Sequence, residues 1–272
     1  MYLTFEAIES GTFKFSGTTS AHTLSYSLDD GTTWTTLAHN TDTPTISAGS
    51  KIMWKGNLTP QSYEGIGRFV ATGRFDVYGN IMSLLYGDDF VGQTSLTGKA
   101  FAFEYLFRYN SKVVSAQNLI LPTTTLAEYC YDSMFEGCTS LTTAPALPAT
   151  TLARFCYYYM FHNCTSLTTA PELPATTLAE YCYQFMFEGC TSLTIAPELP
   201  ATKMASRCYG YMFHNCTNIN YIKMLATDIS ASNALTNWVN GVSSTGTFVK
   251  AAGVTIPTGD SGIPSDWTVV EA

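Results

Sequence analysis

Hydrophobic and polar positions follow the same order four times between residues 121 and 224, with a period of 26 residues. Each unit begins with Leu-Pro and contains two cysteines eight residues apart. The units are LPTTTLAEYCYDSMFEGCTSLTTAPA (121–146), LPATTLARFCYYYMFHNCTSLTTAPE (147–172), LPATTLAEYCYQFMFEGCTSLTIAPE (173–198) and LPATKMASRCYGYMFHNCTNINYIKM (199–224), here called units one to four. A degraded copy precedes them at 102–122. This self-similarity predicts units that stack and bury one another's apolar faces.

The first half of each unit is predicted to be a short helix. Thr125 with Glu128, and Thr177 with Glu180, have the spacing of a capping box at a helix start. The expected buried face follows 3.6-residue spacing and consists of Ala127, Cys130, Tyr131, Met134 and Phe135. The residue before the second cysteine tolerates the left-handed backbone that ends many helices; these residues are Gly137, Asn163, Gly189 and Asn215.

A short strand is predicted after each second cysteine, at 141–143, 167–169, 193–195 and 219–221. The A-P-x-L-P segment that follows in the first three units limits the strand to a few residues, because proline cannot donate a ladder hydrogen bond. One apolar residue of each unit is expected to point inward, and together they would form an internal column of Leu141, Leu167, Leu193 and Ile219.

The pattern L-P-x-x-T-L-x-x-x-C-Y-x-x-M-F-x-x-C-T-S-L resembles the BspA-like (Treponema-type) leucine-rich repeats of bacterial surface proteins, including those of gut bacteria. The resemblance covers about residues 100–224, and the longer unit and doubled cysteine depart from it. It implies a curved solenoid with a role in adhesion or ligand binding. We therefore expect an α+β fold: a leucine-rich repeat solenoid, with a short strand plus a short helix per unit, preceded by an all-β sandwich-like domain.

The flanking segments differ from the repeats in residue composition and in the spacing of their apolar residues. Residues 1–97 contain short aromatic and β-branched runs separated by Gly, Asn, Asp and Pro, which predicts a β-sandwich-like domain. Residues 98–224 would form the solenoid of about five units, and residues 225–272 a cap over its open end. Within this cap, SNALTNWVNG (232–241) is predicted to be a last helix, and TGTFVK and DWTVVEA are predicted to be strands.

The stretch SLDDGTTW (27–34) resembles the Asp-box, a hairpin signature on the propeller blades of sialidases and related glycan-active enzymes. A propeller needs at least about four blades of four strands. Residues 1–97 could supply two at most, and they show one such motif and no arginine cluster suited to a sialic acid carboxylate. We therefore interpret Asp29, Asp30 and Gly31 as turn chemistry, with a glycan-active enzyme as the less favoured alternative.

Charge and composition narrow the choice of partner. The 272-residue chain carries a net charge of −8 and no run of Lys or Arg, which argues against nucleic acid or an anionic membrane as partner. No stretch approaches the roughly 20 apolar residues of a membrane span, and the first residues lack the features of a signal peptide. The family resemblance nevertheless favours an extracellular or cell-surface location.

The eight cysteines form two series, and we expect all of them to be reduced and buried: Cys130, Cys138, Cys156, Cys164, Cys182, Cys190, Cys208 and Cys216. Residues eight apart on a helix are about 12 Å apart, too far for a disulfide, and the C-x₂₋₄-C pairs of zinc sites do not occur. Disulfides and metal binding are the alternatives.

His162 and His214 alternate with Glu136 and Glu188 at one repeat position, either as solvated residues or as a pH- or cation-sensing column.

The sequence contains no G-x-S-x-G, Walker loop, G-x-G-x-x-G or H-E-x-x-H motif, and we expect neither catalysis nor a cofactor. The candidate binding residues lie on or near outward positions of the predicted strands: Thr142, Thr168, Thr194, Asn220, Glu172 and Glu198. We expect a non-enzymatic recognition protein that binds a protein or glycan partner through the repeat surface. A phage or particle-associated attachment protein is the alternative.

Overall fold

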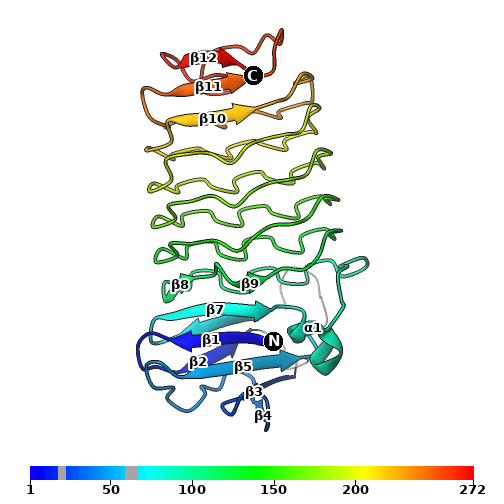
Figure 1. The fold of residues 1–272 in the computed structure, drawn as a ribbon, viewed down its shortest axis with the longest axis vertical. Helices are drawn as coiled ribbons and strands as arrows, with labels where there is room; N and C mark the ends of the chain where they lie inside the picture. Colours follow the sequence, from blue (N-terminus) through cyan, green and yellow to red (C-terminus); the bar gives the residue numbers. More distant parts are fainter. Residues whose placement is uncertain (18–22, 59–66) are drawn as a thin grey trace.

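A computed structural model describes residues 1–17, 23–58 and 67–272. The molecule is elongated, and the 26-residue units lie one above another along its long axis (Figure 1). A β-rich N-terminal region lies at one end, and a three-stranded sheet formed by unit four and the C-terminal segment lies at the other. Among the described residues, no helix has the length and apolar character needed to cross a membrane.

The N-terminal region is built around a seven-stranded sheet in the order β4-β3-β5-β1-β7-β8, with β9 also pairing with β7. Its strands are β1 (Leu3–Ala7), β3 (Leu24–Ser27), β4 (Thr35–Leu37), β5 (Lys51–Gly56), β7 (Phe75–Asn80), β8 (Val113–Ser115) and β9 (Leu119–Ile120). β7 pairs in parallel with β8 and β9, which belong to the degraded copy of the repeat. The sheet therefore continues across residue 97, where the sequence predicts a domain boundary.

The remaining N-terminal elements cover this sheet. β2 (Phe13–Ser16) and β6 (Arg68–Ala71) form a separate antiparallel pair, and α1 (Ser83–Tyr86) and the 3₁₀ helix η1 (Gly87–Phe90) follow β7. Burial alternates along β7, so one face of the sheet packs into a core of aromatic rings. Phe5 lies 4.9 Å from Phe69 between ring centroids, and Phe69 stacks on Phe107 at 5.8 Å. Because Phe107 also stacks on Phe135 at 5.3 Å, this core is continuous with that of the repeats.

Overlapping turns take the place of the predicted helix in every unit. The Cys130 N–H donates to the Ala127 carbonyl at 3.3 Å, three residues back, while the Tyr131 N–H donates to Cys156 of the next unit at 3.0 Å. The alternation continues to residue 138, and units two to four repeat it. Along this segment the N–H groups therefore alternate: one donates within its own turn, and the next donates to the neighbouring unit.

The backbone angles exclude a helix at these positions. Every fourth residue has a positive φ, as at Tyr129 (54°), Ser133 (52°) and Gly137 (69°), whereas an α-helix needs about −63°. The capping boxes predicted at Thr125 and Thr177 are therefore wrong as helix starts, and Thr125 instead forms bridges with Ser95 and Thr151. The same left-handed angle recurs at the other three residues before a second cysteine, Asn163 (57°), Gly189 (72°) and Asn215 (59°).

The predicted α+β leucine-rich repeat solenoid is wrong. In the described residues α1 is the single α-helix, it has four residues, and it lies outside the units. The predicted unit strands are mostly reduced to isolated bridges, such as Ser115 with Thr143 and Thr143 with Thr169. The strands gather in three small sheets instead, one of them the parallel sheet of β10 (Tyr221–Met224), β11 (Thr247–Lys250) and β12 (Thr268–Glu271).

The C-terminal segment continues the stack in the same way. The helix predicted at 232–241 is wrong, because Asn233 (φ 56°), Asn237 (48°) and Gly241 (78°) repeat the left-handed positions of the units. The Tyr209 N–H donates to Ala234 at 3.0 Å, which joins this segment to unit four. β11 and β12 lie within the two stretches predicted to be strands.

Columns of equivalent side chains fill the interior of the stack. Tyr157 stacks on Tyr131 at 5.7 Å and on Tyr183 at 5.8 Å, and each such pair adds about 0.5–1.5 kcal/mol beyond area burial. The expected apolar column is fully buried at Leu141, Leu167, Leu193 and Ile219. The interior is thus a set of vertical stacks that run perpendicular to the chain direction within each unit.

Candidate functional site: a proline-lined groove

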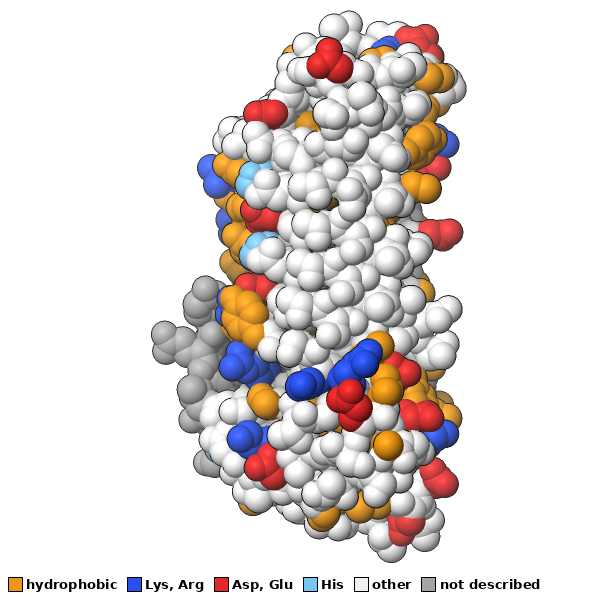
Figure 2. Space-filling model, turned by 90° about the vertical axis from the view of Figure 1, so that its left-hand side faces the viewer, with side chains coloured by type: hydrophobic (Ala, Val, Ile, Leu, Met, Phe, Trp, Pro, Cys, Tyr) orange, Lys and Arg blue, Asp and Glu red, His pale blue; other side chains and the backbone are white. Residues whose placement is uncertain are grey.

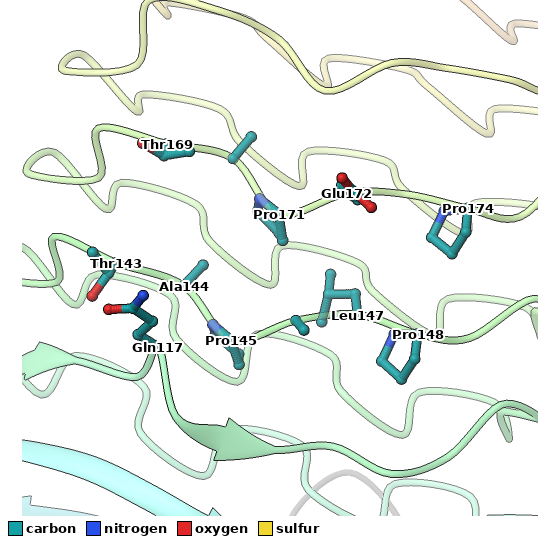
Figure 3. A pocket seen from close by; sticks show the side chains of 12 residues that line it. Gln117, Thr143, Ala144, Pro145, Leu147, Pro148, Thr169, Pro171, Glu172 and Pro174 are labelled. Carbon is teal, nitrogen blue, oxygen red and sulfur yellow. The ribbon is translucent and has the colours of Figure 1, made fainter.

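A groove extends from unit one to the start of unit four, where the A-P-x-L-P segments at the unit junctions lie side by side (Figure 3). Its larger part has a volume of about 550 Å³ and its smaller part about 290 Å³. The two parts share Ala170, Pro171, Glu172 and Pro174, so they adjoin one another. The prolines that line it come in pairs from the junctions between successive units: Pro145 and Pro148, Pro171 and Pro174, and Pro197 and Pro200.

The sequence of the segment explains this lining. In each segment the leucine between the prolines points into the core, as Leu147 and Leu173 are 3% exposed. Pro148 and Pro174 are exposed at the groove, whereas Pro145 and Pro197 are buried beneath its surface. None of these prolines has the N–H that would extend a ladder. Figure 3 shows Pro145 and Pro171 at equivalent places on adjacent units, and likewise Pro148 and Pro174. Stacking therefore places the proline pairs from successive unit junctions side by side, and Pro148 and Pro174 provide the exposed rings.

The structure divides the predicted binding residues between the groove and its border. Glu172 lines both parts of the groove and Glu198 lines the smaller part, and both are exposed. The other four predicted residues, Thr142, Thr168, Thr194 and Asn220, are exposed but do not line it. Their neighbours Thr143 and Thr169 line it instead.

Two of the predicted threonines also hold the units together. The Thr142 hydroxyl donates to the Val114 carbonyl at 3.0 Å, and the Thr168 hydroxyl donates to the Thr142 carbonyl at 3.4 Å. The Asn220 N–H donates to Thr194 at 3.0 Å in the same column. These hydroxyl and backbone groups are therefore engaged in stacking, although the side chains remain at the surface.

The groove has an acidic rim. Glu172 makes no ion pair with any residue that the structure describes, while Glu198 accepts a hydrogen bond from the Lys223 ammonium at 3.0 Å. That pair is exposed, so it contributes at most about 1 kcal/mol and can open to admit a partner. Figure 2 shows a long side of the repeats covered mostly by uncharged polar side chains and backbone, with charged and hydrophobic side chains at its margins.

The histidine and glutamate positions noted in the sequence form one column in space. Arg108, Glu136, His162, Glu188 and His214 follow one another along the stack. The Arg108 Nε atom lies 2.7 Å from Glu136 and the His214 Nδ1 atom lies 2.7 Å from Glu188. Burial would raise the pKa of Glu136, but the nearby His162, 3.6 Å away, and the hydrogen bonds from Tyr109 and Arg108 lower this pKa to about 2. Among the described residues, no group of three or more metal-ligating side chains could hold an ion.

The Asp-box-like stretch forms a turn between β3 and β4, and its polar atoms bind one another. The Thr33 hydroxyl and N–H donate to Asp29 at 2.6 and 2.8 Å, and the Ser27 hydroxyl donates to Asp29 at 2.7 Å. These bonds, first those from Thr33, lower the pKa of Asp29 to about 2. The indole N–H of Trp34 donates to the Gly31 carbonyl at 3.0 Å. The motif is thus occupied in holding its own hairpin.

All eight cysteines are free thiols buried in the core. The second cysteine of a unit donates to a phenylalanine carbonyl of the unit before it, as Cys164 does to Phe135 and Cys190 to Phe161, both at 3.1 Å. Burial raises the pKa of the thiols, to about 12 for Cys156. These contacts give the thiols a packing and hydrogen-bonding role between units.

The groove itself was missed in the sequence, where the prolines were interpreted only as turns. The signal that could have revealed it is the recurrence of A-P-x-L-P at the same repeat position, because stacked units place equivalent residues side by side. Comparison with known proteins adds nothing to this geometry: no protein-family model, curated protein or solved structure matches the chain.

Proposed function

We propose that this chain is a non-enzymatic recognition protein that holds a protein or glycan partner in the proline-lined groove. The observation that supports the proposal is that the two adjoining parts of the groove extend from unit one to the start of unit four, which provides a surface of repeated contacts. Contacts repeated at a fixed spacing add along an extended partner. We also propose that the chain acts at a cell surface or outside the cell.

The chemistry of the groove favours an extended partner with apolar stretches and hydrogen-bond donors. Proline rings are rigid, so they lose little conformational entropy when a partner covers them. The exposed carboxylates of Glu172 and Glu198 can accept hydrogen bonds from sugar hydroxyls or pair with Lys and Arg side chains. An extended basic peptide and a glycan chain both meet these requirements.

The proposal is tested by measuring binding of the full chain to glycan and extracellular-matrix protein arrays, with Ala170→Arg as the groove variant. Ala170 lines both parts of the groove, so an arginine there fills the passage between them. The control is Thr217→Arg, which adds the same charge at an exposed position of unit four away from the groove. We expect array ligands to lose at least tenfold in affinity for Ala170→Arg only. Equal binding by both variants, or no ligand for the unaltered chain, would show that the groove is not the contact surface.

A further inference from the structure

A polar pocket lies on the outer face of the seven-stranded sheet, where that sheet joins the repeats. Strands β5, β1, β7 and β8 follow one another there (Figure 1). The pocket has a volume of about 300 Å³, which is at the lower end of the range for small-molecule sites and suits one small ring. The residues that line it come from these strands and from the turn after β8: Glu6, Lys51, Asp76, Val77, Tyr78, Ser115 and Asn118.

The strand register places the charged side chains of the pocket in one row. Glu6 pairs with Lys51 on β5 and with Asp76 on β7. Between β7 and β8 the register then shifts, so that Asp76 faces Ser115 rather than Val114. Bulges of this kind re-aim a side chain and are frequent next to active sites. The shift brings a serine beside the carboxyl group in place of a valine.

The Asp76 carboxyl group lacks a hydrogen-bond donor for one of its oxygens. Its Oδ1 atom is buried and has no hydrogen-bond partner among the residues that the structure describes. Burial raises the pKa of Asp76, although a hydrogen bond from the Ser115 backbone opposes this. A buried acceptor without a donor is unfavourable, so a ligand that donates to Oδ1 gains free energy from this position.

The charges around the pocket favour a neutral ligand. The Lys51 ammonium lies 3.9 Å from Glu6, and the Tyr78 hydroxyl donates to Glu6 at 3.3 Å. This ammonium repels a second cation, and the carboxyl groups of Glu6 and Asp76 repel an anion. Asn118 adds an exposed amide that both donates and accepts hydrogen bonds. A sugar hydroxyl also donates and accepts, so it matches the carboxyl and amide groups together.

The pocket adjoins one end of the proline-lined groove. The Ser115 hydroxyl of the pocket lies 2.6 Å from the hydroxyl of Thr143, which lines the groove. Gln117 lines the groove, and its neighbour Asn118 lines the pocket. An extended ligand can therefore pass from the pocket into the groove along one face of the molecule.

We propose that this pocket binds one neutral sugar residue, a hydroxyl of which donates to Asp76, and that the glycan bearing this residue continues into the proline-lined groove. The second part rests on the function proposed for the groove, and it selects a glycan over a basic peptide as the occupant. The first part concerns the pocket alone and does not depend on that function.

The experiment on the pocket is titration of the full chain, followed by saturation-transfer NMR, with the methyl glycosides of glucose, galactose, mannose and N-acetylglucosamine. Methyl glucuronide, a sugar ring with a carboxylate, is the charged comparison. Asp76→Ala removes the carboxyl group, and Asn118→Ala removes the amide at an exposed position. Asp89→Ala is the control, because it removes an exposed carboxyl group in η1 outside the pocket.

We expect at least one neutral glycoside to bind the unaltered chain and Asp89→Ala alike, and to lose roughly fivefold or more in affinity for Asp76→Ala and for Asn118→Ala. Methyl glucuronide should bind more weakly than this glycoside by a similar factor. Absence of binding by all four neutral glycosides at millimolar concentration, or unchanged affinity in either pocket variant, would overturn the sugar site. Equal affinity for methyl glucuronide would overturn its preference for a neutral ring.

The continuation into the groove is tested with the tetrasaccharide of the sugar that binds. The tetrasaccharide should bind the unaltered chain more tightly than the methyl glycoside does. Ala170→Arg should remove this gain and leave the affinity for the methyl glycoside unchanged, because Ala170 lines the groove and not the pocket. A tetrasaccharide that binds no more tightly than the methyl glycoside would overturn the continuation, separately from the sugar site.

Discussion

A buried carboxyl group makes the stability of this protein depend on pH. Glu104 is fully buried in the degraded copy of the repeat, as are both of its carboxyl oxygens. Burial first, and the nearby carboxyl group of Asp132 second, raise the pKa of Glu104 from its usual 4.5 to about 8. Burial also raises the pKa of Asp132, to about 7.

The sign of the effect follows from proton counting. Between pH 4.5 and pH 8 the folded state keeps a proton on Glu104 that the unfolded state has lost. Stability therefore decreases as pH rises through this interval. The full difference corresponds to roughly 5 kcal/mol at 1.36 kcal/mol per pKa unit. Because the Asp132 carboxyl titrates together with Glu104, and because the surroundings relax on ionisation, we expect about 3 kcal/mol between pH 5 and pH 9.

Glu104→Gln keeps the shape of the side chain and removes its ionisation. This variant should match the unaltered chain within about 1 kcal/mol at pH 5 and exceed its stability by roughly 3 kcal/mol at pH 9. The assay is urea unfolding across this pH range, followed by fluorescence of the buried Trp54 and Trp238, which report on opposite ends of the molecule. Glu128→Gln, at an exposed position of unit one, is the matched control. Parallel pH profiles for Glu104→Gln and the unaltered chain would refute the reasoning.

Two further predictions concern the contacts between units. The pKa of Glu136 is lowered to about 2, so its stabilising effect is present above its usual value of 4.5 and is lost as pH falls from there toward 2. Glu136→Gln should destabilise the protein by about 3 kcal/mol at pH 7 and far less at pH 2.5. Circular dichroism melts of the variant and the unaltered chain at the two pH values measure this, and an equal loss of stability at both would contradict the prediction. Gly189 has a φ of 72°, and an added Cβ would meet the Asn163 amide oxygen. Gly189→Ala should cost about 1–2 kcal/mol, and adding Asn163→Gly should recover part of it; additive urea midpoints for the two changes would contradict the contact.

The repeat period and the buried positions could be predicted from the sequence, because both depend on residue type at a fixed spacing. Ala127, Cys130, Tyr131, Met134 and Phe135 are all buried. The local conformation could not be predicted from the same pattern. Burial at 3.6-residue spacing arises equally from a helix and from overlapping turns, and the choice depends on whether alternate N–H groups find partners in the next unit.

The residues with a positive φ show why the local conformation could be predicted at some positions and not at others. At Gly137 and Asn163 the residue type itself favours a positive φ. At Tyr129 and Phe155 the same conformation costs about 1–2 kcal/mol in isolation and gives no signal in the sequence. The hydrogen bonds between units offset that cost in the folded protein. The candidate sites were hidden for the same reason, because the groove exists only once the units are stacked and the polar pocket only once β7 is paired with β8.

The alternation of glycine and asparagine before the second cysteine sets a rule for how the array can change in length. Each asparagine extends over the glycine of the following unit, at Asn163 above Gly189 and at Asn215 above Gly241. Duplicating a single 26-residue module would place asparagine over asparagine or glycine over glycine. The two asparagine amides would collide, and the two glycines would leave a space unfilled. Duplicating two modules together preserves the order. We therefore expect units to be gained or lost two at a time during evolution, so that related arrays differ by an even number of units.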